Sequence, residues 1–173
     1  MSRIAREPLR HVELDLSRIA AEVAAELAQG DASRRVEVAI EPGLRARGDA
    51  ALVRNLLQNL LGNAWKFTAG REGARIGFGL DPDANAATDD GTLAAFLVRD
   101  NGAGFEPAYA SKLFRPFQRL HSGEEYEGHG IGLATVKRIV ERHGGTIRAE
   151  GKVGEGATFR FTLPREGEVE APR

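Results

Sequence analysis

The chain contains no cysteine and only 6% aromatic residues in its 173 positions. The lack of cysteine excludes a disulfide framework and cysteine-based zinc sites, and it is compatible with a reducing cytoplasm. No apolar run reaches the roughly 20 residues that a membrane-spanning helix needs. The first residues, MSRIAREPLRHVEL, also lack the apolar centre of a signal peptide. We therefore expect a cytoplasmic piece with no direct membrane insertion, whose parent protein could be soluble or membrane-tethered.

An excess of charge of one sign is also absent. The 24 basic and 25 acidic residues leave a formal net charge of -1, so no overall field attracts nucleic acid or an anionic membrane. A nucleic-acid module would also need a basic face with interleaved aromatic residues, which the sequence lacks. The hydrophobic fraction of 42% and the charged fraction of 28% are ordinary for a globular protein. They predict one domain with a sizeable core.

Hydrophobic periodicity divides this domain into three helices and five strands. Apolar residues at helical spacing predict helices at 16–27, 54–68 and 133–142, the second after the capping residue Asp49. Alternating patterns predict strands at 35–40, 74–80, 93–100, 146–150 and 158–163. The domain is thus expected at 16–164, between a lead at 1–15 and a polar tail at 165–173 that is expected to be disordered.

The helix at 54–68, RNLLQNLLGNAWKFT, carries three asparagines, Asn55, Asn59 and Asn63. Asparagine is a poor helix former because its short amide competes for backbone hydrogen bonds. A helical projection places the three residues and Lys66 in one narrow arc, opposite an apolar arc that includes Phe67. This polar arc could simply face water. Alternatively it is a ligand site, since neutral amide oxygens suit Mg²⁺ and lysine suits phosphate.

Three glycine-containing segments bear on this choice. DNGAG at 100–104 follows a predicted strand, where glycine admits a planar ligand and the aspartate could accept a hydrogen bond from an exocyclic amine. GHGIG at 128–132 runs into the last helix and offers backbone N–H groups to phosphate. GEGAT at 154–158 separates the last two strands. Each alone could be an ordinary turn or loop, and none fits the dinucleotide fingerprint or the P-loop.

In this order the segments resemble the conserved boxes of the ATP-binding catalytic domain of sensor histidine kinases. These kinases belong to the GHKL superfamily, with DNA gyrase, heat-shock chaperones and mismatch-repair ATPases. The matching segments are NLLGNAWKF at 59–67 (N box), DNGAGF at 100–105 (first glycine box), LFRPFQRLH at 113–121 (F box), GHGIGLATVKRIVERHGG at 128–145 (second glycine box) and GEGATFRFTLP at 154–164 (third glycine box). The stretch 116–140 is particularly similar to phytochrome-like and PAS-linked kinases. The resemblance implies an α/β fold, a two-layer sandwich with a mixed sheet, helices on one face and a mobile ATP lid.

The resemblance also implies roles for individual residues. It identifies Asn63 as the Mg²⁺ ligand, with Asn59 one turn earlier on the same face and Lys66 reaching the phosphates. Asp100 is expected to accept a hydrogen bond from the adenine amino group, with Thr158 supporting it directly or through water, and Gly102 and Gly104 admitting the base. The full set expected to bind ATP is Asn59, Asn63, Lys66, Phe67, Asp100, Gly102, Gly104, Gly128, Gly130, Ile131, Gly132, Leu133 and Thr158; the catalytic set is Asn59, Lys66 and Arg119, and Phe114 and Phe117 are expected to anchor the lid. Asn55 receives no role.

Position 59 separates two branches of the superfamily. The ATPase relatives carry a glutamate there that activates water, and the amide of Asn59 cannot take a proton from water. Transfer to a protein histidine is therefore favoured over hydrolysis. None of the four histidines, at positions 11, 121, 129 and 143, lies in the H-E-x-x-P context of the phosphorylated residue. His11 and His143 are expected to be surface residues, and His129 replaces the small hydroxyl residue common in the second glycine box.

The acceptor is thus expected on a dimerisation domain of the parent kinase, absent from this chain, with a response regulator downstream. The lead at 1–15 resembles the end of the second dimerisation helix and its linker. The resemblance implies a monomer that binds ATP and Mg²⁺ without phosphorylating itself, and the glycine-rich stretch 122–132 predicts a lid that is not ordered without nucleotide. The alternative is a nucleotide-binding regulatory module without kinase activity, either degenerate or similar to an anti-sigma kinase.

Overall fold

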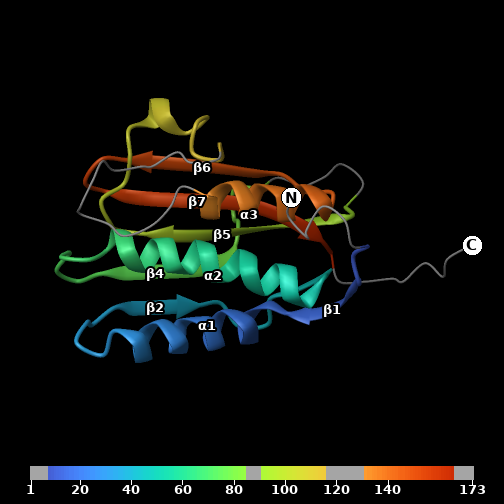
Figure 1. Ribbon diagram of the computed structural model, residues 1–173, viewed down its shortest axis with the longest axis horizontal. Helices are drawn as coiled ribbons and strands as arrows, with labels where there is room; N and C mark the ends of the chain where they lie inside the picture. The colour runs from blue at the N-terminus through green and yellow to red at the C-terminus, as the bar shows by residue number, and fades with distance from the viewer. Residues whose placement is uncertain (1–7, 85–90, 116–130, 166–173) are drawn as a thin grey trace, which may run out of the picture.

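Alternating apolar residues build a central sheet. The computed structural model describes residues 8–84, 91–115 and 131–165, and five strands join in the order β2-β4-β5-β7-β6. The strands are β2 (Glu37–Ile40), β4 (Arg75–Leu80), β5 (Leu93–Asp100), β6 (Ile147–Lys152) and β7 (Gly156–Pro164). Strands β2 and β4 run parallel, and the other neighbouring pairs are antiparallel (Figure 1). The sheet is therefore mixed, as the resemblance implies.

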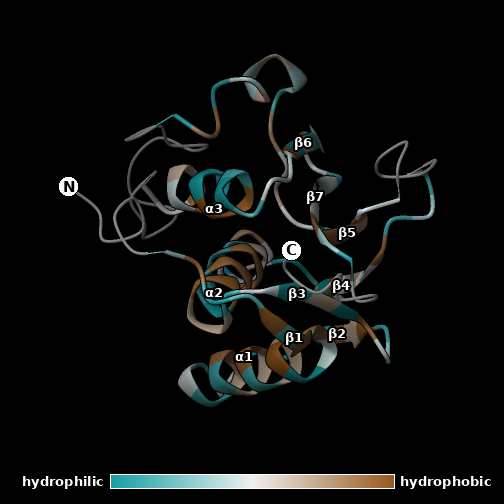
Figure 2. Cartoon of the chain, turned by 90° about the vertical axis from the view of Figure 1, so that its right-hand side faces the viewer, coloured by the Kyte–Doolittle hydropathy of each residue, from teal (hydrophilic) through white to brown (hydrophobic). Residues whose placement is uncertain are grey.

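Three helices cover one face of this sheet, namely α1 (Leu16–Gly30), α2 (Ala50–Phe67) and α3 (Ile131–Arg142). Figure 2 shows all three on the same side of the row of strands, with α2 between α1 and α3. The side chain of Asp49 caps α2 by accepting a hydrogen bond from the N–H of Leu52 at 3.2 Å. Among the described residues, no helix is both long enough and apolar enough to cross a membrane.

The core lies between the helices and the sheet. Its centre is an aromatic cluster of Phe78, Phe96 and Phe161, whose ring centroids lie 5.7 to 6.3 Å apart. The apolar side of α2 packs onto it through Val53, Leu56, Leu57, Leu60, Leu61, Ala64 and Trp65, which are all buried. Phe67, which the helical projection placed on the apolar arc, is only half-buried because it is the last residue of the helix. The opposite side of α2 is left free for polar residues.

The three predicted helices and five predicted strands are all present, with small differences at their ends. Two short strands were not predicted, β1 (Val12–Asp15) and β3 (Arg45–Gly48), which pair antiparallel as a separate sheet. Both are only four residues long, and in β1 only Leu14 is buried, so the sequence offers too short a pattern to predict them. Strand β1 falls within the lead at 1–15. A short 3-10 helix, η2 (Pro107–Tyr109), follows β5.

His143 is buried, so the expectation of a surface histidine is wrong for this residue. Only 4% of it is exposed. Its Nε2 accepts a hydrogen bond from the N–H of Asp49 at 3.0 Å, and its Nδ1 lies 2.7 Å from the carbonyl oxygen of Ile139. The reason is that the C-terminal end of α3 packs beside the N-terminal end of α2. His11 is exposed as expected, with its ring centroid 5.7 Å from that of His143.

Candidate functional site

Two of the asparagines on α2 form a hydrogen-bonded pair on its polar side. The side-chain nitrogen of Asn59 donates to the backbone oxygen of Asn55 at 2.9 Å and to its side-chain oxygen at 2.6 Å. Because a backbone oxygen only accepts, this contact fixes which end of the Asn59 amide is the nitrogen. The side-chain oxygen of Asn59 therefore points away from Asn55. Asn55, which had no expected role, orients Asn59.

The side-chain oxygen of Asn59 faces the beginning of α3. A Cβ atom on Gly132 would lie 2.6 Å from this oxygen, so a larger residue would displace Asn59. Helix α3 begins at Ile131, and Leu133, two residues later, is buried. The first backbone N–H groups of a helix have no partner within the helix. The side-chain oxygen of Asn59 thus lies beside the first turn of α3.

Asn63 and Lys66 continue the polar side of α2 toward its C-terminal end. Asn63 is half-buried, and Lys66, in the last turn of the helix, is exposed. Mg²⁺ usually takes only one or two oxygen ligands from a protein and completes its shell with water and phosphate oxygens. The side-chain oxygen of Asn59 points away from α2 toward the start of α3, and Asn63 lies one turn further along α2. Two amide side chains at this spacing could supply the one or two protein ligands that Mg²⁺ takes. The lysine adds a positive charge for phosphate.

Asp100 is a buried carboxylate at the end of β5. It is 6% exposed, and its Oδ1 accepts a hydrogen bond from the N–H of Gly102 at 2.8 Å. Burial raises the pKa of Asp100 to about 6, against the backbone N–H groups of Gly102 and Ala157 and the charge of Arg71, which lower it. The strongest charge-stabilising partners of a carboxylate would be cations in contact with it, and Asp100 has two backbone N–H groups instead. It is therefore placed to accept a further hydrogen bond from a ligand.

Gly102 and Gly104 allow close backbone packing around Asp100. A Cβ atom on Gly102 would overlap the carbonyl oxygen of Phe67 at the end of α2, and one on Gly104 would overlap the carbonyl oxygen of Lys152. Gly104 also has a φ of +65°, which favours glycine. These two glycines were expected to admit a base. In the structure they bring the loop after β5 against α2 and against the turn between β6 and β7.

Thr158 lies on the other face of the sheet from Asp100. Strand register pairs Thr158 with Arg99, whereas Asp100 is paired with Ala157. Paired residues point to the same face of a sheet, and successive residues point to opposite faces. The register therefore does not support a direct hydrogen bond between Thr158 and Asp100. The backbone N–H of Ala157 takes that place.

Helix α2 is the common wall of the site. Its Asn59 lies against Gly132, and the carbonyl of its Phe67 accepts a hydrogen bond from the N–H of Ala103 at 2.9 Å. Residues 59 and 67 are eight positions apart, or about 12 Å along a helix. The structure thus brings the N box and the first glycine box together, and the start of α3 beside them.

Several expected residues lie outside the described part of the chain. They are Phe117, Arg119, Gly128, His129 and Gly130, together with most of the stretch 122–132 for which lid order was predicted. The described part before it ends at residue 115; there Leu113 is buried and the ring of Phe114 meets that of Phe159 edge-on at 6.3 Å.

Two residues near Asp100, namely Arg71 and Asn101, have no role predicted from the sequence. Arg71 donates hydrogen bonds to the carbonyl oxygens of Gly102 and Gly154. Asn101 holds the same loop from the other side, since its side chain accepts from the N–H of Arg75 at 2.7 Å and donates to the carbonyl of Gly73 at 2.9 Å. Both belong to polar turns, where arginine and asparagine are common. Asparagine in a D-N-G turn is the only hint that the sequence offers.

Comparison with known proteins agrees with this geometry. A family model described as "Histidine kinase-, DNA gyrase B-, and HSP90-like ATPase" matches residues 48–167. Cyanobacterial phytochrome A from Nostoc sp. is 46% identical over 112 residues, which are 65% of this chain and 14% of that protein. Phytochrome-like protein Cph1 from Synechocystis sp. is 37% identical over 134 residues, 78% of this chain and 17% of that protein. The chain therefore spans only a small part of these relatives.

Solved structures show the same fold. A mycobacterial sensor histidine kinase, MprB, superposes with a TM-score of 0.70 at 25% identity, over 90% of this chain and 97% of that one. Full-length ShkA in complex with AMPPNP superposes with a TM-score of 0.71 at 27% identity, over 93% of this chain and 33% of that one. The family model covers well over half of the 173 residues. The chain therefore belongs to the family of histidine kinase-, DNA gyrase B- and HSP90-like ATPases, with the fold of a histidine kinase catalytic domain.

Proposed function

We propose that this chain is the ATP-binding catalytic domain of a sensor histidine kinase, which transfers the γ-phosphate of Mg-ATP to a histidine of a separate dimerisation domain. The observation that carries the proposal is that α2 joins a buried carboxylate at its C-terminal end to a row of amide side chains along its polar side. The relatives support it, because they include a signal transduction histidine-protein kinase/phosphatase, 38% identical over 74% of this chain. A fold neighbour also binds AMPPNP.

The base lies at the end of α2 near Asp100 in this proposal. The carboxylate accepts a hydrogen bond from the exocyclic amine of adenine, while guanine presents an oxygen at the same place. Two oxygens in contact would repel, so Asp100 selects ATP over GTP. Phe67, half-buried at the end of α2, borders the loop of Gly102 and Gly104. Thr158 has no direct part in the contact.

The phosphates lie along the polar side of α2 in this proposal. Asn63 and Asn59 provide oxygen ligands for Mg²⁺, and Lys66 neutralises phosphate charge. When bound, the metal ion neutralises charge that develops on the transferred phosphoryl group. The N–H groups at the start of α3, around Ile131, Gly132 and Leu133, donate to phosphate oxygens. Gly128 and Gly130 complete this cradle, and Arg119 contacts the γ-phosphate.

The hydrogen-bonded pair of Asn55 and Asn59 favours transfer of phosphate to a histidine over hydrolysis of ATP. The side-chain nitrogen of Asn59 is engaged by Asn55, and its oxygen is not basic enough to activate water. An incoming imidazole is itself a nucleophile and needs no such base. The partner is thus the histidine-containing dimerisation domain of the parent kinase, in the cytoplasm, with a response regulator receiving the phosphoryl group. The isolated domain is a monomer.

The test is a titration of the purified chain with ATP and with GTP, each with and without Mg²⁺. The wild type is expected to bind ATP selectively, Asp100→Asn to lose the selectivity, and Asn63→Ala to lose the Mg²⁺ dependence. Labelled ATP is then added together with a separately purified dimerisation domain. Acid-labile phosphate should appear on that domain and not on this chain. Selective ATP binding without transfer would indicate a regulatory module, and no binding would refute the proposal.

A further inference from the structure

Arg71 bridges two loops at the end of the molecule where β5 ends. It lies in the turn after α2, where its backbone N–H donates to the carbonyl of Thr68 at 3.0 Å. Its guanidinium donates to the carbonyl oxygen of Gly102 at 2.9 Å and to that of Gly154 at 2.5 Å. Gly102 belongs to the loop after β5, and Gly154 to the turn between β6 and β7. One side chain thus ties together three segments that are distant in sequence.

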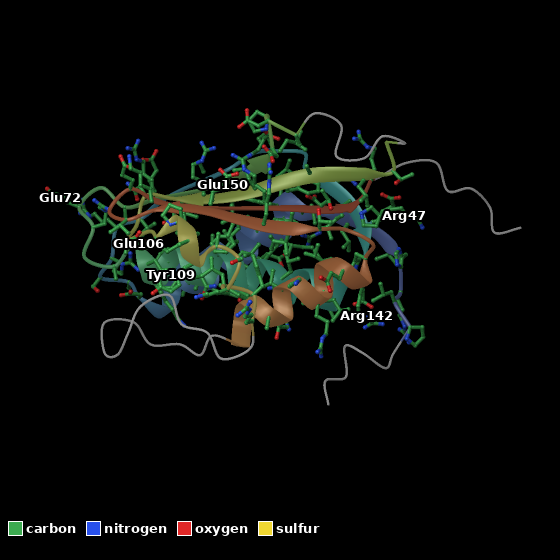
Figure 3. All side chains as sticks on the ribbon, turned by 90° about the horizontal axis from the view of Figure 1, so that it is seen from above. Arg47, Glu72, Glu106, Tyr109, Arg142 and Glu150 are labelled. Atoms are coloured by element: carbon green, nitrogen blue, oxygen red, sulfur yellow. The ribbon has the colours of Figure 1, made fainter. Side chains whose placement is uncertain are left out.

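These segments also contact one another. The N–H of Gly154 donates to the carbonyl of Ala103 at 2.8 Å, and the N–H of Ala103 donates to the carbonyl of Phe67 at 2.9 Å. Figure 1 shows the C-terminal end of α2, the end of β5 and the turn between β6 and β7 at the same end of the molecule. Glu72, the chain neighbour of Arg71, is labelled at this end in Figure 3. Arg71 therefore reinforces an existing junction.

Gly102 connects Arg71 to Asp100. The N–H of Gly102 donates to Oδ1 of Asp100 at 2.8 Å, and its carbonyl accepts the hydrogen bond from Arg71. Both polar backbone groups of Gly102 are fixed in this way. The charge of Arg71 also lowers the pKa of Asp100, against the larger effect of burial. Arg71 thus acts on the carboxylate through geometry and through charge.

We propose that Arg71 is a positioning residue for recognition of the nucleotide base, because its bridge between Gly102 and Gly154 holds the loop that orients Asp100. The proposal rests on the function proposed above, which assigns the base contact to Asp100. Arginine presents several N–H donors in a rigid plane, whereas lysine is a flexible point charge. Arg71→Lys therefore keeps the charge and loses the planar bridge.

Three variants separate the bridge from the charge. Arg71→Ala removes both, Arg71→Lys keeps the charge, and Arg75→Ala removes a neighbouring exposed charge from the same surface hollow. Calorimetric titrations compare ATP, GTP and inorganic triphosphate for each protein. Arg71→Ala should weaken ATP binding about tenfold, equivalent to about 1.4 kcal/mol, and lose the preference for ATP over GTP. Binding of triphosphate should stay unchanged, and Arg75→Ala should behave as the wild type.

A second measurement uses the free protein, so it does not depend on nucleotide binding. Carbon-detected NMR follows the titration of the Asp100 carboxyl, and hydrogen exchange follows the amides of Gly102 and Gly154. Arg71→Ala should raise the pKa of Asp100 and speed exchange at both amides. Arg71→Lys should restore the pKa of Asp100. It should restore neither the slow exchange of the two amides nor the preference for ATP over GTP.

Several results would overturn the proposal. An unchanged titration and unchanged exchange in Arg71→Ala would show that the bridge does not hold the loop. Equal losses of ATP and triphosphate affinity would show that Arg71 only attracts phosphate from a distance. If the wild type binds no ATP, the proposed function fails, whereas the NMR data still decide whether Arg71 positions Asp100.

Discussion

Asp100 is a single residue whose environment favours a particular ligand. It is buried, and its hydrogen bonds come from the backbone N–H groups of Gly102 and Ala157. Burial raises its pKa to about 6 because the charged form loses water that these two donors replace only in part. An additional N–H donor from a ligand stabilises the ionised form. Ligand binding and ionisation of Asp100 are therefore linked.

The affinity for ATP is accordingly expected to fall in acid. With a pKa of about 6 in the free protein, Asp100 is a carboxylate above that pH and accepts from the adenine amine. Below it the carboxyl is protonated, and affinity should fall by up to about tenfold per pH unit. Calorimetry across this range measures the effect. Asp100→Asn is the control, since its profile contains only the titration of ATP itself, and parallel profiles for the two proteins would contradict the expectation.

Helix α2 acts as one element because its polar residues depend on each other. Asn55 holds the amide of Asn59 so that its oxygen faces the start of α3. The helix is fixed at its N-terminal end by Asp49, whose backbone N–H donates a hydrogen bond to His143, directly after α3. The contact of Asn59 with the start of α3 and the hydrogen bond between Asp49 and His143 together set the relative position of α2 and α3. The same helix therefore carries the proposed metal ligands and the contacts that pack it against α3.

Asn55→Ala is expected to weaken Mg-ATP binding without destabilising the fold. The change frees the amide of Asn59 to rotate, and a lost hydrogen bond of this kind corresponds to about a five-fold loss of affinity. Alanine favours a helix more than asparagine, so the unfolding free energy should not decrease. Titration with ATP in Mg²⁺ measures the first effect and denaturant unfolding the second. Gln58→Ala, at the exposed neighbouring position, is the control and should change neither quantity.

His143 is expected to make stability depend on pH. Its Nε2 accepts from Asp49 and its Nδ1 donates to Ile139, so only the neutral ring satisfies both contacts. Burial lowers the pKa of His143 below its usual value, and the nearby charges of His11 and Arg142 act in the same direction, whereas Asp49 opposes them. The unfolded chain takes up this proton at about pH 6.5. The stabilisation is therefore present above that pH and is lost as the pH falls through the folded-state pKa.

The measurement compares wild type with His143→Ala by denaturant unfolding at neutral and at acidic pH. At neutral pH the variant should lose about 2 to 3 kcal/mol, for a buried ring and two hydrogen bonds. The difference should shrink below about pH 6. A constant difference at all pH values would contradict the neutral-ring interpretation. His11→Ala, an exposed ring beside it, should have little effect.

In the molecule as a whole, the sheet has two different faces. The helices and the proposed site cover one face, and a cluster of ion pairs lies on the other. On the face away from the helices, Arg160 is 10% exposed in its side chain and pairs with Asp81, Asp83 and Glu150. Burial alone would raise the pKa of Asp81, but the hydrogen bond from Arg160 holds it below its usual value. Figure 3 shows Glu150 on the side of the sheet opposite the helices. This cluster joins β7, β6 and the loop after β4.

Arg160→Ala should therefore cost stability and leave ATP binding unchanged. Removing the arginine leaves the carboxylate of Asp81 buried without its partner, which should lower the unfolding free energy by about 3 kcal/mol. The proposed nucleotide site lies on the helix side, so ATP affinity in the folded variant should stay within about two-fold of the wild type. Unfolding curves and titrations of the same samples test both parts. Glu150→Gln, an exposed member of the cluster, should have a much smaller effect on stability.

The sequence alone determined the elements and the order of the candidate site residues. Hydrophobic periodicity is local, so α2 and the strands β4, β5 and β7 could be located without knowing their neighbours. The same holds for the polar arc of Asn59, Asn63 and Lys66, because helix geometry fixes which residues share a side. The fold class and the family followed from five segments in one order. These are properties of short stretches of chain.

Which of these stretches meet, and which way their side chains face, depends on the packing of the whole chain. This packing buried His143 against α2, turned Thr158 to the sheet face away from Asp100, and assigned Gly102 to backbone packing. It also joined β1 to β3 and placed Arg71 between two loops. Each of these facts depends on strand register or on a contact between residues far apart in the chain. Such contacts form only when the whole core packs, and no local pattern encodes them.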